Sequence, residues 1–134
     1  MSRYLLDTDV LIDYAYGKEP AVSRIKGLIA QGDDLGLCAI AVAEFFAGLR
    51  PHQRDYWRRV LSTFVSWDVS FDAARCAGEW RYDFERRGIT QATSDTLNAA
   101  VAVERGATLL TRNARDYPME GLSLLPLIRE AGSA

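Results

Sequence analysis

Residues 4–11 read Tyr4-Leu5-Leu6-Asp7-Thr8-Asp9-Val10-Leu11. The apolar run before Asp7 is typical of a short buried strand, and the apolar residues after Asp9 recur at helical spacing. Asp9 stands directly before Val10, and we interpret it as the cap of that helix, which leaves Asp7 without an evident structural role. The stretch therefore predicts a strand, a polar turn and a helix.

The same alternation of short apolar strands and helices continues along the chain. It indicates βαβ units and hence a parallel sheet covered by helices on both faces. We expect one α/β domain over residues 1–134 with four to five strands, a largely buried helix over 40–49, and fraying of residues 132–134. The further strands are expected at 35–39, 65–69, 108–111 and 122–125, and the further helices at 20–29, 52–64, 71–87 and 94–105.

Composition limits the possible chemistry and the compartment. The chain has 134 residues, of which 49% are hydrophobic and 25% charged, as in ordinary soluble domains. It shows no secretory signal and no apolar run of the length a membrane span needs, so we expect a cytoplasmic protein without a membrane partner. The single histidine, His52, excludes a histidine-rich metal site and argues against a Ser-His-Asp triad. Any hydrolytic chemistry must then rest on carboxylates.

Two acids stand out where a structural explanation is weak. Asp7 directly follows a predicted strand, at the edge of a parallel sheet where ligands usually bind. Glu44 is the single acid in the apolar run Ala41-Val42-Ala43-Glu44-Phe45-Phe46-Ala47. Because an unpaired buried carboxylate is costly, Glu44 must reach solvent, pair with Arg50 or another arginine, or hold a metal.

Two further acids have simple structural explanations when each is taken alone. Asp95 lies in a predicted first helical turn that Thr93 or Ser94 can cap, where an acid also suits the helix dipole. Asp116 is either a turn acid or the third residue of a short helix capped by Asn113.

Together, four segments resemble the motifs of PIN-domain nucleases, and specifically of the VapC-type toxins of bacterial and archaeal toxin-antitoxin pairs. The segments occur in the family's order and span nearly the whole chain, although Asn98 stands where an apolar residue is more usual. They are Leu5 to Asp13, Ala43-Glu44-Phe45 to Gly48-Leu49-Arg50, Asp95 to Ala100, and Leu110-Thr111-Arg112-Asn113 to Asp116-Tyr117.

The resemblance implies a PIN-like fold and an endoribonuclease that leaves a 5′-phosphate. The implied catalytic and metal-binding acids are Asp7, Glu44, Asp95 and Asp116, which would converge on one or two Mg²⁺ or Mn²⁺ ions. Thr8, Thr111 and Asn113 would be supporting polar residues, and whether Asn113 or Asp116 lies nearer the metal stays open. Arg50, Arg112 and Arg115 are candidates for contacts with RNA phosphates, because a guanidinium suits phosphate oxygens.

The chemistry of such a site agrees with a metal cofactor. Four converging carboxylates repel one another and raise each other's pKa unless a divalent cation neutralises them. An all-oxygen ligand set favours Mg²⁺ or Mn²⁺ over zinc.

Two alternative functions share features with this sequence. A haloacid dehalogenase-like phosphatase would use the Asp7-x-Asp9 pair, and a response-regulator receiver is related to it. Both families rely on a lysine late in the chain, whereas Lys18 and Lys26 are the only lysines here. The other alternative is a catalytically silent RNA-binding PIN module, which the complete set of acids argues against.

The resemblance also implies partners. VapC-type proteins usually form homodimers and are silenced by a VapB-type antitoxin whose segment lies in a groove near the active site. Phe45, Phe46, Tyr56 and Trp57, on two adjacent predicted helices, are candidates for lining that groove or for plain core.

Overall fold

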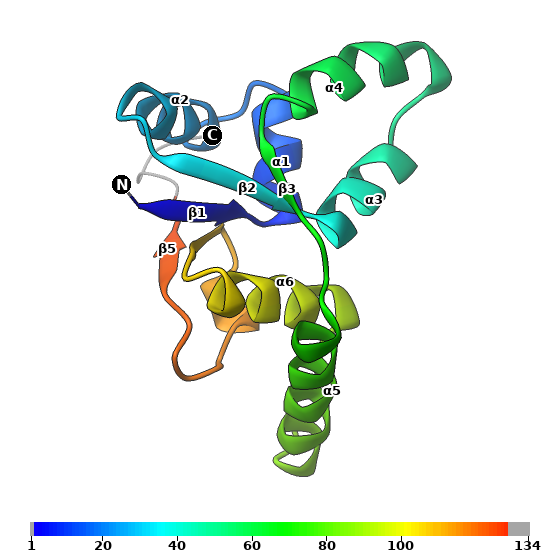
Figure 1. Ribbon diagram of the computed structural model, residues 1–134, viewed down its shortest axis with the longest axis vertical. Helices are drawn as coiled ribbons and strands as arrows, with labels where there is room; N and C mark the ends of the chain where they lie inside the picture. Colours follow the sequence, from blue (N-terminus) through cyan, green and yellow to red (C-terminus); the bar gives the residue numbers. More distant parts are fainter. Residues whose placement is uncertain (1, 129–134) are drawn as a thin grey trace.

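Five parallel strands form one sheet in the order β3-β2-β1-β4-β5 in the computed structural model, which describes residues 2–128 (Figure 1). This confirms the predicted α/β fold. The expected fraying of residues 132–134 lies outside the described residues. The strands are β1 (Arg3–Leu6), β2 (Asp34–Cys38), β3 (Val65–Trp67), β4 (Thr108–Thr111) and β5 (Leu124–Pro126).

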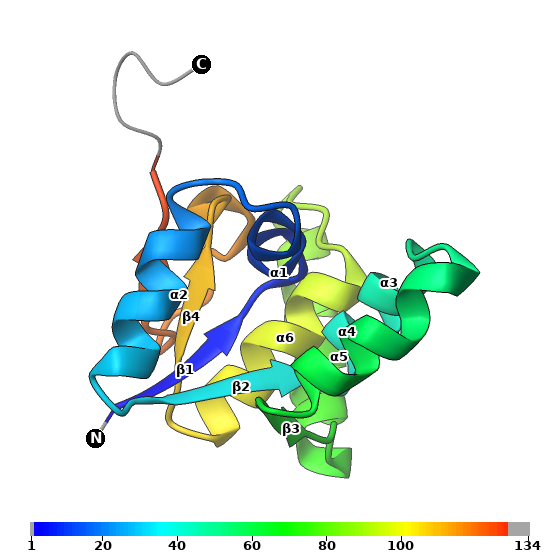
Figure 2. The ribbon, with the colours of Figure 1, turned by 90° about the horizontal axis from the view of Figure 1, so that it is seen from above.

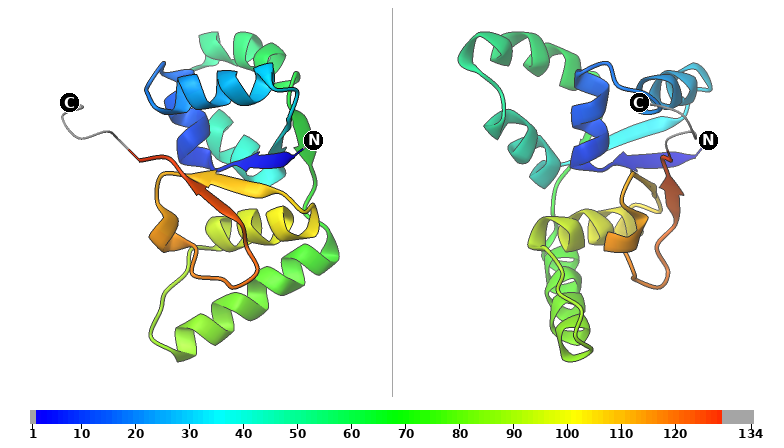
Figure 3. Two further views of the ribbon diagram at one scale, coloured as in Figure 1. Left: turned by 90° about the vertical axis from the view of Figure 1, so that its left-hand side faces the viewer. Right: turned by 180° about the vertical axis from the view of Figure 1, so that it is seen from behind.

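Six helices cover the two faces of the sheet. One face carries α1 (Thr8–Ala15), α2 (Ala21–Ala30), α3 (Ala39–Ala47) and α4 (Arg54–Leu61), and the other carries α5 (Phe71–Arg86) and α6 (Thr93–Glu104) (Figure 1). On the second face α6 lies against β1 and β4, and α5 packs on α6 (Figure 3). Two short 3₁₀ turns complete the chain, η1 (Pro51–Gln53) and η2 (Ala114–Asp116). Within residues 2–128, no helix combines the length and apolarity needed to cross a bilayer.

The alternation of side chains along the two central strands separates two hydrophobic cores. Leu5 and Leu109 point into the core beneath α6, whereas Leu6 and Leu110 point into the core beneath α1 and α2. All four are completely buried, as the inner strands of a doubly covered parallel sheet require. The sheet therefore fixes where β1 and β4 end, and β1 leads directly into α1 (Figure 2).

The prediction of a largely buried helix over 40–49 is wrong. Within α3 only Ala41 and Phe45 are buried, and Ala43, Glu44 and Ala47 are exposed. The helix starts at the end of β2 and runs outward past the sheet, so only one side of it contacts α1 and α6 (Figure 1). The apolar composition of this helix does not reveal that it extends beyond the sheet, which is why its burial was overestimated.

The outer strands differ in extent from their predictions. β3 ends at Trp67 rather than at residue 69, and β5 begins at Leu124 rather than at residue 122. Each is an edge strand with a single neighbour, so its limits depend on the pairing partner rather than on its own residues. Pro126 is tolerated in β5 because an edge strand leaves one row of backbone N–H groups unpaired.

Asn98, where the sequence departs from the family pattern, lies inside the α6 layer. The residue is 1% exposed, and neither atom of its amide has a hydrogen-bond partner within residues 2–128. A buried amide without a partner costs about 1–3 kcal/mol. It therefore weakens the layer one helical turn from Asp95.

Gly36 in β2 generates a prediction about stability. A Cβ at this position would lie 2.3 Å from the ring of the buried Trp67, so we expect Gly36→Ala to lower the free energy of unfolding by about 2 kcal/mol. The matched control is Gly78→Ala in α5, where a Cβ would meet nothing within 4 Å and alanine favours the helix. Chemical denaturation measures both, and a Gly36→Ala protein as stable as the wild type would contradict this packing.

Candidate active site

Asp7 lies at the carboxyl end of β1, where it is 6% exposed and serves as the N-cap of α1. Its Oδ1 accepts a hydrogen bond from the Thr8 backbone N–H at 2.8 Å, and its Oδ2 accepts one from Thr111 Oγ1 at 2.9 Å. The interpretation that Asp9 caps this helix and that Asp7 has no structural role is therefore wrong. Asp7 both begins the helix and presents a carboxylate at the sheet edge.

Thr111 joins the ends of the two central strands. It is completely buried at the end of β4, beside β1, and its hydroxyl donates to Asp7 while accepting from the Asn113 backbone N–H at 3.0 Å. One hydroxyl thus fixes the Asp7 carboxylate and the start of the loop that carries Asp116. Thr111, expected as a supporting polar residue, contacts both segments through this hydroxyl.

Glu44 reaches the same edge from α3. Its Oε1 accepts a hydrogen bond from Thr8 Oγ1 at 2.8 Å, so Glu44 is bound to the residue next to Asp7. Among the alternatives left open by the sequence, Glu44 is exposed to solvent, and within residues 2–128 it forms no ion pair with Arg50 or another arginine. Its charge is therefore not balanced by a neighbouring cation.

Asp95 enters the site from the first turn of α6, which begins at Thr93 after Ala92. Neither Thr93 nor Ser94 caps this helix, because both lie inside it and the N-cap position has no side-chain hydrogen bond. Asp95 is half-buried, and the hydroxyl of Tyr117 donates to its Oδ1 at 3.4 Å.

The charges around Asp95 show that four acids share this region. The pKa of Asp95 is raised to about 6, first by burial and then by the charges of Asp7, Asp116 and Glu44, whereas the Tyr117 hydroxyl opposes the shift. The charges that shift the pKa of Asp95 all belong to carboxylates. The structure thus brings together the four acids that the sequence singled out.

Burial also dominates at Asp7. It raises the pKa of this carboxyl above its usual value although hydrogen bonds from Thr111, Tyr117 and the Thr8 backbone act to lower it. The nearby charge of Asp9 adds to the rise. The two most enclosed acids of the site are therefore both held in conditions that disfavour their charge.

Asn113 and Asp116, the two polar residues of the fourth motif, interact with different groups. Asp116 is the exposed last residue of η2, and its charge acts on Asp95. Asn113 instead donates from Nδ2 to Asp9 Oδ2 at 3.0 Å. Asp116 thus acts on the acids through its charge, whereas the Asn113 side chain is bound to Asp9.

Arg112, although exposed, pairs with two acids of α1. Its Nη1 lies 3.0 Å from both carboxylate oxygens of the nearly buried Asp13, and its Nη2 lies 3.8 Å from Asp9 Oδ2. Arg50 and Arg115 are exposed. Of the three arginines proposed for phosphate contacts, Arg112 therefore already has carboxylate partners.

The donor set fits Mg²⁺ or Mn²⁺ by its chemistry. Asp7, Glu44, Asp95 and Asp116 offer only oxygen ligands, and no arginine or lysine appears among the groups that shift the pKa of Asp95. Among residues 2–128, no three acidic, histidine or cysteine side chains converge tightly enough to form a ligand sphere. The four acids therefore form a cluster within electrostatic reach, which a divalent cation would neutralise.

Sequence reasoning missed Tyr117 and the pairing of Asp9 and Asp13. Tyr117 follows Asp116 directly, but an adjacent aromatic residue gives no sign that its hydroxyl lies against Asp95. Asp13 lies one helical turn from Asp9, a spacing that places both on the same side of α1. That spacing was the available signal for a shared cationic partner.

Comparison with known proteins gives consistent matches over most of the chain. The family model for the PIN domain matches residues 4–118. Ribonuclease VapC19 of Mycobacterium tuberculosis is 32% identical over 117 residues, which cover 86% of this chain and 92% of that protein. Ribonuclease VapC2 of Rickettsia felis is 28% identical over 120 residues, covering 85% and 89%.

Solved structures share the fold. The crystal structure of VapBC2 from Rickettsia felis bound to a DNA fragment from their promoter matches with a TM-score of 0.80 at 22% identity, covering 92% of this chain and 98% of that one. A toxin-antitoxin complex from Klebsiella pneumoniae matches with a TM-score of 0.76 at 26% identity, covering 95% and 99%.

The pKa of Asp95 generates a prediction about the metal-free protein. Because folding raises this pKa from 3.8 to about 6, the folded state holds more protons between those values, and stability falls as pH rises through this window. We expect Asp95→Asn, which removes the charge, to raise the unfolding temperature at pH 7 by about 3 °C or more and to have little effect at pH 4.

Thermal unfolding followed by circular dichroism in EDTA measures this effect. Asp34→Asn at the start of β2, on the opposite edge of the sheet, is the matched control. Equal unfolding temperatures of wild type and Asp95→Asn at pH 7 would show that the acids do not repel one another.

Proposed function

The chain belongs to the PIN-domain family, and from this membership we propose that it is a metal-dependent endoribonuclease toxin of the VapC type. The observation that carries the proposal is the cluster of Asp7, Glu44, Asp95 and Asp116 at the carboxyl edge of the sheet, with which no arginine or lysine of residues 2–128 forms an ion pair. The matched relatives are named ribonucleases, which supports RNA as the substrate. The proposal implies the cytoplasm as the compartment.

The four acids would hold Mg²⁺ or Mn²⁺. When bound, such an ion lowers the pKa of a coordinated water and stabilises charge on the phosphoryl group and on the departing oxygen. Asp7 is fixed for this purpose by Thr8 and Thr111, and Glu44 is fixed by Thr8. These bonds hold the carboxylates before substrate arrives, which reduces the reorganisation that binding requires.

Contacts with the RNA backbone fall to the exposed arginines. Arg50 is exposed between α3, which carries Glu44, and η1, and Arg115 is exposed in η2 beside Asp116. Arg112, whose charge is matched by Asp13, is assigned to holding the loop after β4 against α1. Guanidinium groups at the rim offset the repulsion between an acidic site and a polyanion.

A haloacid dehalogenase-like phosphatase is disfavoured by the position of Asp9. In that chemistry the second acid of the pair faces the substrate, whereas Asp9 accepts a hydrogen bond from Asn113 and lies 3.8 Å from Arg112. Asp9 is thereby committed to a contact within the protein. A silent RNA-binding module is separated from a nuclease by the experiment below.

Removing the charge of Asp7 tests the activity. Asp7→Asn keeps one oxygen that can cap α1, and its amide nitrogen can donate to the Thr111 hydroxyl in place of Oδ2, so we expect an unchanged circular dichroism spectrum and RNA cleavage reduced at least a hundredfold. Asp34→Asn, with its side chain on the opposite edge, should cleave like the wild type. Cleavage that survives Asp7→Asn, or that survives EDTA in the wild type, would contradict a metal-dependent nuclease.

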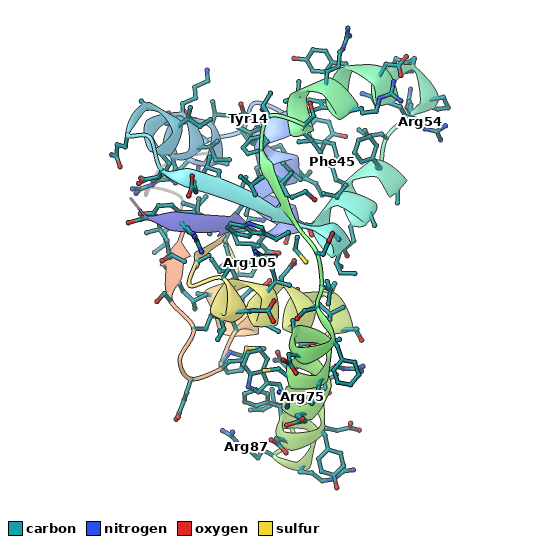
Figure 4. All side chains as sticks on the ribbon, viewed as in Figure 1. Tyr14, Phe45, Arg54, Arg75, Arg87 and Arg105 are labelled. Atoms are coloured by element: carbon teal, nitrogen blue, oxygen red, sulfur yellow. The ribbon has the colours of Figure 1, made fainter. Side chains whose placement is uncertain are left out.

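An antitoxin partner and a homodimer complete the proposal. The matched solved structures include toxin-antitoxin complexes, which supports a VapB-type partner for this chain. The aromatic side chains expected to line its groove do lie together, with ring centroids 5.5 Å apart for Phe45 and Trp57 and 5.0 Å apart for Tyr56 and Trp57. These side chains join α3 to α4, and Figure 4 shows Phe45 between the two helices. Arg54, at the start of α4, lies at the outer end of this helix pair.

Exposure within this aromatic group points to Tyr56 as the residue open to a partner. Phe45 is buried, Phe46 and Trp57 are half-buried, and Tyr56 is 56% exposed. We expect Tyr56→Ser to weaken binding of the antitoxin encoded beside this gene about tenfold, because exposed tyrosines often carry interface energy. Titration calorimetry measures the affinity, and light scattering measures the mass of the free protein and of the complex.

Tyr82→Ser is the matched control for that experiment. Tyr82 is 58% exposed but lies on α5, which covers the other face of the sheet. Equal loss of affinity in the two variants, or no loss in Tyr56→Ser, would place the antitoxin elsewhere.

A further inference from the structure

Tyr117 has a buried ring and a hydroxyl that lies beside the carboxylate of Asp95. The residue is 3% exposed, and its ring belongs to the core that includes Ala99, Leu109 and Met119. Its position is therefore set by packing rather than by the hydrogen bond it makes. The hydroxyl lies 3.4 Å from Asp95 Oδ1, and hydrogen bonding to it acts on the pKa values of both Asp95 and Asp7.

The hydroxyl of Tyr117 is the donor in its contact with Asp95. A phenol carries its proton at neutral pH and offers it to Asp95 Oδ1 at 3.4 Å, which is long for a hydroxyl donor. Hydrogen bonding to the same hydroxyl also acts to lower the pKa of Asp7. The phenol therefore lies close to both acids.

The two acids differ in how much other support they have. Asp7 is held from Thr8 and Thr111 as well, whereas within residues 2–128 Tyr117 makes the one side-chain hydrogen bond to Asp95. Loss of the hydroxyl would therefore release Asp95 far more than Asp7.

We propose that Tyr117 is a positioning residue that holds the Asp95 carboxylate beside Asp7 in the arrangement that receives the divalent cation. The inference rests on the metal site of the proposed function. The phenol belongs to the protein core and contacts Asp95 Oδ1, so the Oδ2 atom of Asp95 stays available to the cation. Groups that orient ligands in this way typically change metal affinity 10–100-fold.

Tyr117→Phe tests the inference because it deletes a single oxygen and keeps the packed ring. We expect the dissociation constant for Mn²⁺ to rise about tenfold in calorimetry, and the electron paramagnetic resonance signal of bound Mn²⁺ to change, with an unchanged circular dichroism spectrum. The matched control is Tyr14→Phe, whose ring packs edge-on against Phe64 at a centroid distance of 6.3 Å; it should bind Mn²⁺ like the wild type.

A double-mutant cycle separates positioning from a general effect on the fold. In an Asp95→Ala background the hydroxyl has no side-chain oxygen to hold at that position, so adding Tyr117→Phe should change Mn²⁺ affinity less than twofold. An equal tenfold loss in both backgrounds would assign Tyr117 a merely structural role and overturn the inference.

The outcomes distinguish this inference from the function on which it rests. A wild-type protein that takes up no Mn²⁺ overturns the metal site, and the role of Tyr117 with it. A wild-type protein that binds Mn²⁺ while Tyr117→Phe binds it equally well overturns the role of Tyr117 alone and leaves the proposed nuclease intact.

Discussion

Repulsion among carboxylates at the carboxyl edge of the sheet is the constraint around which this structure is organised. The parallel pairing of β1 with β4 brings Asp7 and Thr111 together, and α3 and α6 carry Glu44 and Asp95 to the same edge. Burial and mutual charge disfavour ionisation of the two enclosed acids. Hydroxyl and backbone donors offset part of this cost, and a divalent cation would offset the rest.

A second group of acids next to the first is neutralised within the protein. Asp9 on α1 accepts a hydrogen bond from Asn113 and lies near Arg112, and Asp13 on the same helix pairs with Arg112. Both partners come from the loop after β4. These contacts hold that loop against α1 and so place Asp116, which closes the cluster. The contrast is functional, because Arg112 pairs with Asp9 and Asp13, whereas within residues 2–128 no arginine or lysine forms an ion pair with the acids assigned to catalysis.

The fold and the four acids were predictable because they depend on short segments. An apolar run followed by Asp7, and one acid inside the apolar helix of Glu44, are visible in the sequence alone. The roles of individual polar atoms were not predictable. Which of Asp7 and Asp9 caps α1 depends on contacts with Thr111 and Asn113, each 104 residues away from its partner in the sequence. Where the Tyr117 hydroxyl points depends on Asp95, 22 residues before it.

The central claim is that these carboxylates gather to bind a divalent cation, and anomalous diffraction tests it most directly. Crystals grown with millimolar Mn²⁺, measured at the manganese absorption edge, should show an anomalous peak within ligand distance of Asp7 and Asp95, with Glu44 or Asp116 nearby. An ordered site with no anomalous peak among these carboxylates would contradict the account.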